Sequence, residues 1–486
     1  MTDSSAAAGH VRVASVPGRT SPGRAREVLK PVSRRAFLRA LGLGLVTASS
    51  LLSACANGPT EPTGTKSGTP ILYVRTLPEA KPTSAKYKVS VLHCPPEATD
   101  TEIESRVAEA IDQVVDLQRA LQGKRKVFLK PNMAGQELAR YRGRLQALTD
   151  PAVLRGVVAA IRRHYQGEIV IGEAPTTTQV SFTDIYASAG YAQALKGFNV
   201  RTIDLNQAPF VELGVPGGGL MFSRYTLSRE LANVDFVVSV AKMKSHVSAG
   251  VTLTLKNLFG LPPISIYGCP RRYLHSLIRL PRVLVDMGLI FRPDLCVVDG
   301  LVGQNGKEWD GWGADTEVLI AGNNVVATDA TACRFMGVDP LADYGQAPFL
   351  WDRNPLRLAH DAKLGSARAD DIELSGDDWS RWTHPQFYVE RTLSADEPRE
   401  RQSLVEQARA YLQQRDGLLR EHAGQIVCFQ DSRPAFFLPD ASGLGFEPGQ
   451  KGSFLWGPAG MGSLLKRVLP AEEDPEHMEV YDQIQG

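Results

Sequence analysis

The segment "AKMKSHVSAGVTLTLKNLFG", residues 241–260, places three lysines and a histidine directly after an apolar run. If residues 236–246 form a strand, alternate residues share one face, and that face ends in Lys242, Lys244 and His246. Ammonium groups buried without partners destabilise a fold or lose their protons. A phosphate or carboxylate on a ligand would offset that cost. The pattern therefore predicts a site for a small anionic molecule.

Four further apolar runs end in a charged residue. These residues are Lys130, Glu173, Asp204 and Asp299. In an open parallel sheet, the carboxyl ends of the strands line one crevice, and ligands bind there. We therefore expect these side chains beside the lysines. The alternative is that each charged residue is separately exposed to solvent where the chain leaves its strand, because charged residues often follow strands.

These residues suggest specific roles. Lys244 and His246 are the candidates for catalysis, with His246 transferring a proton. The candidates for binding a substrate or cofactor are Lys130, Asn132, Glu173, Lys242, Lys256, Asn257 and Asp299. Glu173 and Asp299 would orient lysines or hold a metal. A lysine with a lowered pKa could also act as a base or as a Schiff-base nucleophile.

The rest of the chain must position these residues. From about residue 86, continuous Val, Ile and Leu runs alternate with segments of helical periodicity, which is typical of strands buried on both faces. The sequence predicts an α/β fold with a largely parallel sheet between helices and a small appended C-terminal α+β region. The predicted strands are 88–94, 126–130, 168–173, 200–205, 235–242, 294–300 and 317–322, and the predicted helices are 101–122, 151–165, 181–189 and 325–336.

Local signals define some of these elements. Asp150 followed by Pro151 is typical of a helix start. Three successive glycines at 217–219 indicate a hairpin. Residues 250–258 fit either a helix or a strand, and both place Lys256 on a polar side.

The N-terminal part predicts export and anchoring. Paired arginines, Arg34 and Arg35, precede a short uncharged stretch, which is similar to a twin-arginine signal. The stretch is too short for a spanning helix and ends in "LSAC", which resembles a lipoprotein processing box with Cys55 as the lipidated residue. We expect attachment through Cys55 to the outer face of the cytoplasmic membrane, or a periplasmic location. An uncleaved membrane anchor, or a free cysteine at position 55, is the alternative.

Composition divides the chain into regions. The predicted regions are a signal at 1–55, a flexible Gly/Pro/Thr/Ser-rich tether at 56–85, an α/β domain at 86–376 and a C-terminal extension at 377–486. The extension includes an amphipathic helix at 401–419. A net charge of +1, from 54 basic and 53 acidic residues, gives no support for nucleic-acid binding.

Cysteines and acidic residues give little indication of a metal site. Beyond Cys55 an odd number of cysteines remains, without a C-x-x-C pair, so the chain has no iron–sulfur or zinc cluster motif. An acidic loop could bind a divalent cation, but it lacks the calcium-loop spacing, and a solvated loop is favoured. Its polar residues are Asp299, Asn305, Glu308, Asp310 and Asp315.

Several motifs together resemble the family called domain of unknown function 362, over residues 86–376. They are "KPN" at 130–132, "GEAP" at 172–175, "KMKSH" at 242–246, "KNLFG" at 256–260, "VVDG" at 297–300 and "ATDATACRFMGVDP" at 327–340. The resemblance implies an α/β domain. Many members carry an added ferredoxin segment with an iron–sulfur cluster, which this chain lacks. The loop after "VVDG" is longer than is usual in the family, so Trp309 and Trp312 would reshape the pocket.

Two functions fit these features. The first is an anchored, exported enzyme whose lysine-rich crevice binds an anionic substrate or cofactor, with a redox-related reaction as one option. The second is a tethered extracytoplasmic protein that binds an anionic ligand without changing it. A plainer alternative makes the lysines structural ion-pair partners. The expected partners are therefore an anionic small molecule and, through Cys55, a membrane; the sequence specifies no cofactor, metal or oligomeric state.

Overall fold

The computed structural model describes most of the chain after residue 85. The described ranges are 72–73, 86–135, 137–176, 180–382, 385–390, 397–444 and 462–485. The predicted signal with Cys55 lies outside them, as does the predicted tether apart from residues 72–73. Across the described ranges, no helix combines the length and the apolar character needed to cross a membrane.

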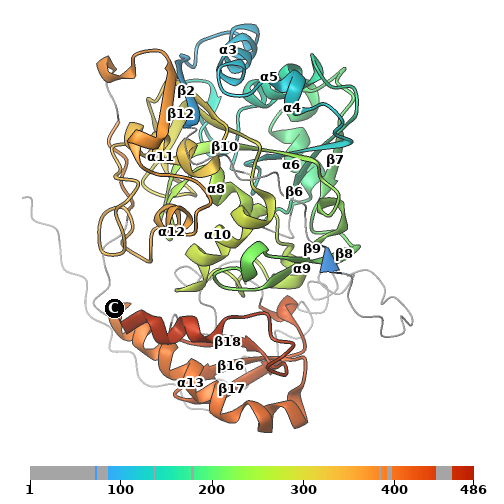
Figure 1. Cartoon of the computed structure of the whole chain (residues 1–486), viewed down its shortest axis with the longest axis vertical. Helices are drawn as coiled ribbons and strands as arrows, with labels where there is room; N and C mark the ends of the chain where they lie inside the picture. Colours follow the sequence, from blue (N-terminus) through green and yellow to red (C-terminus); the bar gives the residue numbers. More distant parts are fainter. Residues whose placement is uncertain are drawn as a thin grey trace, which may run out of the picture. The chain divides into compact units, whose positions relative to one another are not determined.

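A ten-stranded sheet forms the centre of the described structure (Figure 1). Its spatial order is β15 (Ile372–Gly376), β2 (Tyr87–His93), β14 (Val318–Gly322), β12 (Leu295–Asn305), β10 (Phe236–His246), β3 (Lys126–Pro131), β6 (Glu168–Glu173) and β7 (Arg201–Asp204), with β11 (Gly250–Thr252) beside β10 and β13 (Trp312–Ala314) beside β12. Along this order the neighbours are parallel, except that β14 is antiparallel to β2 and β12. The prediction of a largely parallel α/β sheet is confirmed.

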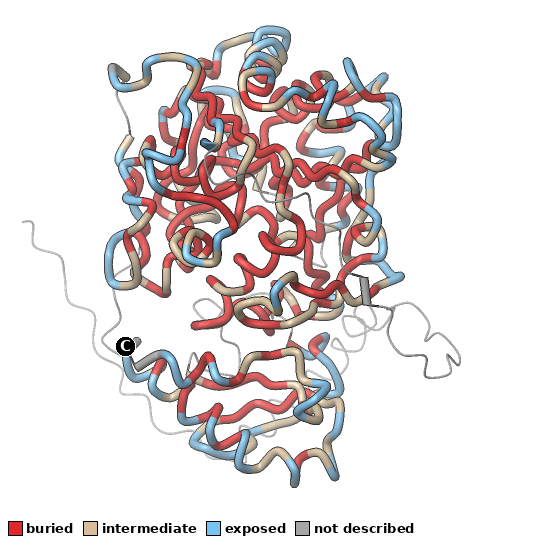
Figure 2. Tube along the Cα trace, in the orientation of Figure 1, coloured by how far each residue is buried: buried red, intermediate tan, exposed pale blue. Residues whose placement is uncertain are grey.

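Helices cover both faces of this sheet. One face packs against α3 (Asp100–Asp112), α5 (Pro151–Arg162) and α6 (Phe182–Ser188), and the other packs against α10 (Arg279–Phe291) and α11 (Val325–Phe335). Strands β10 and β12 are buried at every residue, which explains their continuous apolar runs. Figure 2 shows the central strands as the buried middle of the fold.

Apart from α13 (Glu397–His422), the remaining helical segments are short. They are α4 (Leu117–Ala120), α7 (Tyr191–Ala194), α8 (Thr254–Asn257), α9 (Ile264–Tyr267), α12 (Pro355–Asp361) and 3-10 turns at Pro216–Gly218, Arg229–Leu231, Leu258–Gly260, Ala369–Asp371, Trp379–Arg381, Ala441–Gly443 and Met478–Gln485. The predicted helix 101–122 is therefore two helices, α3 and α4. The second begins at its own cap, because the Asp116 side chain accepts a hydrogen bond from the Arg119 amide.

Local capping fixes the start of α5. The Asp150 side chain accepts a hydrogen bond from the Ala152 amide at 3.0 Å, and Pro151 occupies the first turn of α5. Proline suits this position because its missing N–H would have no partner there. The start of α5 thus lies where the sequence predicts it.

Two smaller sheets flank the central one. β1 (Leu72–Tyr73), β8 (Phe210–Gly214) and β9 (Arg224–Ser228) form the first, in which β8 and β9 make the hairpin predicted by the glycine run. β16 (Ile426–Gln430), β17 (Arg433–Leu438) and β18 (Leu464–Arg467) form the second, which packs with α13 (Glu397–His422). A two-stranded pair, β4 (Arg140–Tyr141) and β5 (Arg144–Leu145), completes the described strands.

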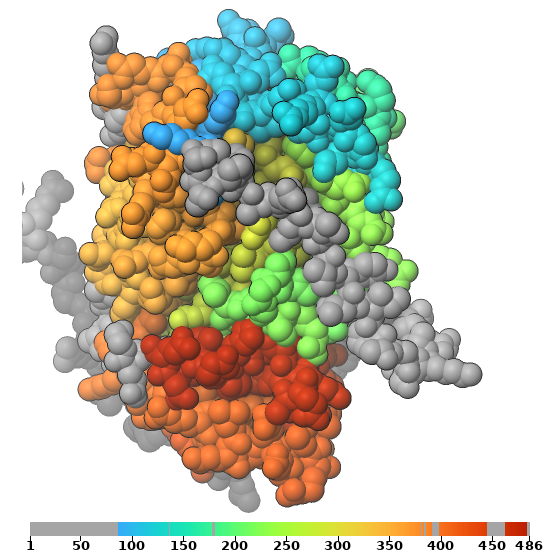
Figure 3. Space-filling view, in the orientation of Figure 1, coloured from blue at the N-terminus to red at the C-terminus, as the bar shows by residue number. Residues whose placement is uncertain are grey.

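The C-terminal α+β region packs directly on the rest of the fold. Figure 3 shows its last residues, in red, against the green residues of the β8–β9 hairpin. Phe222 forms a β-bridge with Glu476, and a His477 ring nitrogen lies 2.8 Å from the Gly218 carbonyl oxygen. The region is therefore part of the same compact unit as the central sheet.

Candidate functional site

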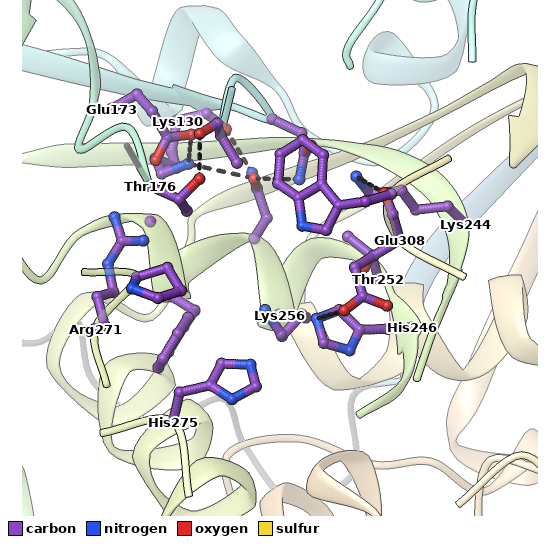
Figure 4. Close-up of a pocket in the computed structure, with 17 residues that line it drawn as sticks. Lys130, Glu173, Thr176, Lys244, His246, Thr252, Lys256, Arg271, His275 and Glu308 are labelled. Carbon is purple, nitrogen blue, oxygen red and sulfur yellow. Dashed lines mark hydrogen bonds and ion pairs between the residues drawn. The ribbon is translucent and has the colours of Figure 1, made fainter. Parts of the chain in front are cut away.

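A cavity of about 80 Å³ lies at the carboxyl ends of β3, β6 and β10 (Figure 4). These strands contribute Lys130, Glu173 and Lys244 to its wall. The segment after β10 adds Thr252 and Lys256. Since one water needs roughly 10–15 Å³ of such space, the cavity admits a small molecule rather than a large cofactor.

The cavity wall carries more positive than negative groups. The cations are Lys130, Lys244, Lys256 and Arg271, and the carboxylates are Glu173 and Glu308. Four cations against two carboxylates leave an excess of two positive charges when all three lysines are protonated. The wall also holds two histidines, His246 and His275. This balance favours an anionic occupant.

Lys130 has a complete set of partners. Its ammonium donates to Glu173 Oε2 at 2.6 Å, to the Pro131 carbonyl oxygen at 2.8 Å and to Asn257 Oδ1 at 3.3 Å. Asn257 is itself held in place, because its side-chain Nδ2 donates to the Lys130 carbonyl oxygen at 2.6 Å. Asn132 Nδ2 also donates to Asn257 Oδ1, at 3.3 Å. Lys130, Glu173, Asn132 and Asn257 thus form one buried network at the floor of the cavity.

Lys244 is nearly fully buried and is held by backbone oxygens. Its ammonium donates to the Ala147 carbonyl oxygen at 2.9 Å and to the Glu308 carbonyl oxygen at 3.4 Å, and it lies 5.4 Å from the centre of the Trp309 ring. Burial lowers the pKa of Lys244 to about 8, although the nearby carboxylates of Glu137 and Glu308 oppose the shift. Lys244 therefore keeps a positive charge at neutral pH without a carboxylate bonded to it.

Lys256 is half-buried, and its partners differ from those of Lys130 and Lys244. Its ammonium lies 4.7 Å from the centre of the Phe259 ring, and among the described residues it makes no hydrogen bond or ion pair. Burial lowers its pKa to about 7; Glu308 opposes this shift, whereas Arg271 and Lys244 add to it. At neutral pH a large fraction of Lys256 is therefore a free amine. Figure 4 shows its side chain among the labelled residues of the wall.

The hydrogen bonds of His246 define its tautomer. Its Nδ1 accepts from the amides of Ser248 and Ala249, at 3.1 and 3.2 Å, so the proton of the neutral ring is on Nε2. Burial lowers the pKa of His246 well below 6.5. Nε2 lies 3.8 Å from Glu308 Oε1. The ring is thus a hydrogen-bond donor through Nε2, and the proton transfer that the sequence suggested for it stays a prediction.

The segment 270–275 forms a wall that the sequence analysis missed. Arg271 Nε donates to the Pro262 carbonyl oxygen at 2.6 Å, and its Nη2 donates to the Ala174 carbonyl oxygen. His275 lies 6.1 Å from His246, ring centre to ring centre, and burial lowers its pKa to about 3. A signal was present in "RRYLH", where an arginine and a histidine stand four residues apart.

Lys242 and Asp299 lie near the cavity but do not line it. Lys242 Nζ and Asp299 Oδ2 are 3.1 Å apart, and both side chains are fully buried. Asp299 also accepts from the Asp150 amide at 2.6 Å, which joins this pair to the start of α5. The plainer alternative, a structural ion pair, therefore describes these two residues. Asp204 is also outside the wall and bonds to the Asn206 amide.

The side chains of the acidic loop after β12 lie in several different environments. Glu308 and Trp309 line the cavity, whereas Asp315 accepts from Arg142 at 2.8 Å. Trp312 is 40% exposed and packs against Tyr388. Of the two tryptophans expected to reshape the pocket, Trp309 therefore borders it. Within the described ranges, no group of three or more histidine, cysteine, aspartate or glutamate residues is arranged to hold a metal ion.

Fold and cavity together define an α/β protein with a cation-lined cavity at the carboxyl ends of parallel strands. Residues 127–334, which include every cavity residue named above, match the family described as Domain of unknown function (DUF362). Thylakoid-associated protein sll1697 of Synechocystis sp. is 25% identical over 221 residues, which cover 44% of this chain and 64% of that protein. These two matches support the family resemblance that the motifs indicated.

A solved structure was also compared. It is the lactate racemase apoprotein from Thermoanaerobacterium thermosaccharolyticum, with 13% sequence identity and a TM-score of 0.31. The alignment covers 55% of this chain and 61% of that chain.

Proposed function

We propose that this protein binds a small anionic molecule in the cavity at the carboxyl ends of β3, β6 and β10. The single observation that carries the proposal is the unpaired ammonium of Lys256, which faces a cavity whose other cations are already held. A carboxylate or phosphate oxygen would give it the acceptor it lacks. The excess positive charge of the wall favours the same class of ligand.

Unpaired polar atoms around the cavity support this proposal. Four wall residues have a buried polar atom without a hydrogen-bond partner among the described residues: Asn132 Oδ1, Glu173 Oε1, Thr252 Oγ1 and His275 Nδ1. Buried polar atoms in proteins are nearly always paired, so several unpaired ones around one cavity favour a polar occupant. A ligand that carries both donors and acceptors would satisfy more of them than a simple ion.

Sulfate is a suitable first probe, because it stays a dianion over the working pH range. We expect Lys256→Met to weaken sulfate binding by roughly ten- to a hundredfold, the value of a hydrogen bond to a charged group. Calorimetric titration at constant ionic strength measures this. Lys196→Met is the matched control, since Lys196 is exposed and lies outside the cavity wall. Equal affinity in both variants would contradict the proposal.

We also propose that the protein is exported and attached to a membrane through Cys55. The support is in the sequence alone: the paired Arg34 and Arg35, the short uncharged stretch and the "LSAC" box. Cells that express the full chain should therefore carry it in the membrane fraction, labelled by radioactive palmitate. Cys55→Ala should abolish the label and release the protein from that fraction. An unlabelled wild-type protein would rule out lipidation.

A further inference from the structure

The cationic groups of the cavity are engaged to different degrees. Lys130 is bonded to a carboxylate, Lys244 to two carbonyl oxygens and Arg271 to two others. Lys256 alone among these four, in the described structure, makes no hydrogen bond or ion pair, and its ammonium lies over the Phe259 ring. The first three can attract an anion without leaving their positions. Lys256 is free to react.

We propose that Lys256 is a nucleophile that forms an imine with a small oxo acid held in this cavity. The inference rests on the proposed anion site, because the acid group of the ligand is what the surrounding cations recognise. The carbonyl group of the same ligand is what the Lys256 amine attacks. A compact oxo acid is the ligand class that joins these two groups within a cavity of about 80 Å³.

The surroundings of Lys256 match what amine nucleophiles require. An amine reacts with a carbonyl only when it is unprotonated, and enzymes achieve this by burying the lysine or by placing a second cation beside it. Both conditions hold here. Burial is the largest cause of the lowered pKa of Lys256, which is about 7, and the charges of Arg271 and Lys244 lower it further. The cations therefore hold the acid group and also keep the amine reactive.

The chemical step balances without an oxidant or a reductant. The amine nitrogen attacks the carbonyl carbon, so a C–N bond forms while the π bond of the carbonyl breaks. The oxygen takes up both amine protons and leaves as water, which gives the neutral imine. One added proton gives the iminium form. The Nε2–H of His246, on the same wall, suits hydrogen bonding to the oxygen as it leaves.

The test is trapping with sodium borohydride, which reduces an imine to a stable secondary amine. Glyoxylate and pyruvate, the smallest 2-oxo acids, are the probes. With pyruvate, the wild-type chain should gain the mass of pyruvic acid less one oxygen atom, on the peptide that contains Lys256. Lys256→Met should lose this adduct, and Lys196→Met should keep it. Lys244→Met should need a higher concentration of pyruvate for the same labelling.

Three outcomes are informative. Labelling confined to Lys256 and competed by sulfate would support the inference. Sulfate binding without any adduct on Lys256 would overturn it and leave the anion site intact. No sulfate binding at all would overturn both. The peptide map of the wild-type protein decides the matter even if Lys256→Met fails to fold, because it reports which lysine carries the adduct.

Discussion

At the scale of single residues, the lysines of the cavity differ in their partners. Burial lowers the pKa of Lys130, but its three acceptors, including the Glu173 carboxylate, oppose that shift. Lys256 has only the face of Phe259. A cation above an aromatic ring gains less than one bonded to a carboxylate. Lys256 is therefore the lysine whose charge the protein compensates least and whose protonation a bound anion changes most.

Sulfate binding should weaken as the pH rises through about 7. The pKa of Lys256 in the empty cavity is about 7, lowered first by burial, and a bound anion favours the ammonium form. Affinity should therefore be constant below about pH 6 and fall by at most about tenfold per pH unit above 7, for each lysine that titrates. Calorimetric titration from pH 6 to 9 tests this.

Two comparisons sharpen this pH experiment. In Lys256→Met the decrease in sulfate affinity near pH 7 should disappear. The decrease that follows the titration of Lys244, with a pKa of about 8, should remain. Imine formation needs the free amine, so its trapping should rise over the range in which sulfate binding falls. A wild-type affinity that does not change between pH 6 and 9 would show that neither lysine contacts the anion.

The sequence placed side chains near one another where a strand carried them. Lys130, Glu173 and Lys244 lie at or near the carboxyl ends of their strands. Parallel strands bring these ends to one edge of the sheet, so the sequence pattern places the three side chains together. Lys242 was also expected there, but the register of β10 against β12 shifts between Lys242 and Lys244, and such a shift re-aims side chains. Arg271 lies in irregular backbone, where no periodicity exists to place a side chain.

At the scale of elements, residues 250–260 show why the sequence allowed two interpretations. The segment is a strand up to Thr252 and a helix from Thr254, so each interpretation fits one half. The following 3-10 turn brings Gly260 back to β6, where its carbonyl oxygen accepts from the Ala174 amide at 2.9 Å. This close return places Lys256 and Asn257 over the ends of β3 and β6.

Gly260→Ala tests this close approach. An added Cβ would overlap Glu173 Oε1 and lie 2.6 Å from Lys130 Nζ, both in the network at the cavity floor. We expect a loss of about 1–3 kcal/mol in the free energy of unfolding, typical of overpacking, together with weaker sulfate binding. Urea unfolding and calorimetric titration measure the two effects.

Gly417→Ala is the matched control for that substitution. Gly417 lies inside α13, and an added Cβ would come no closer than 3.7 Å to Arg420 Nη2. Alanine is favoured over glycine inside helices by roughly 0.5–1 kcal/mol, so this variant should be slightly more stable than the wild type. If both variants lost stability equally, the clash at the cavity floor would not be the cause.

At the scale of the whole molecule, a buried ion network joins the C-terminal region to the cavity wall. Arg279 Nη2 lies 2.6 Å from Glu476 Oε1, and Arg279 Nη1 donates to the Tyr273 carbonyl oxygen at 2.8 Å. Tyr273 stands between Arg271 and His275 in the chain. The C-terminal region therefore supports the backbone that presents those two side chains to the cavity.

Glu476→Gln should destabilise the protein by about 3–5 kcal/mol, because it leaves Arg279 buried without its carboxylate and removes one of the two carboxylates of Lys466. Urea unfolding measures the change. Glu472→Gln, at an exposed position, should stay within about 0.5 kcal/mol of the wild type. Equal stability of the two variants would show that the network does not hold the region in place.

The sequence predicted the layers of the molecule better than their contacts. Continuous apolar runs gave the sheet, and helical periodicity gave α5, α6 and α11, because these patterns are local. The support of residues 270–275 by residues far along the chain follows from tertiary packing. No local pattern in "RLPRVL" indicates that Arg279 meets Glu476.

The pairing of Arg279 with Glu476 also has a consequence for the order in which the molecule is built. The two residues are 197 positions apart, so the ribosome makes Arg279 long before its partner exists. Until residue 476 is synthesised, the segment with Arg271 and His275 lacks this support, and closing so long a loop is slow. We therefore expect the cavity wall to be completed only after residue 476 has been synthesised.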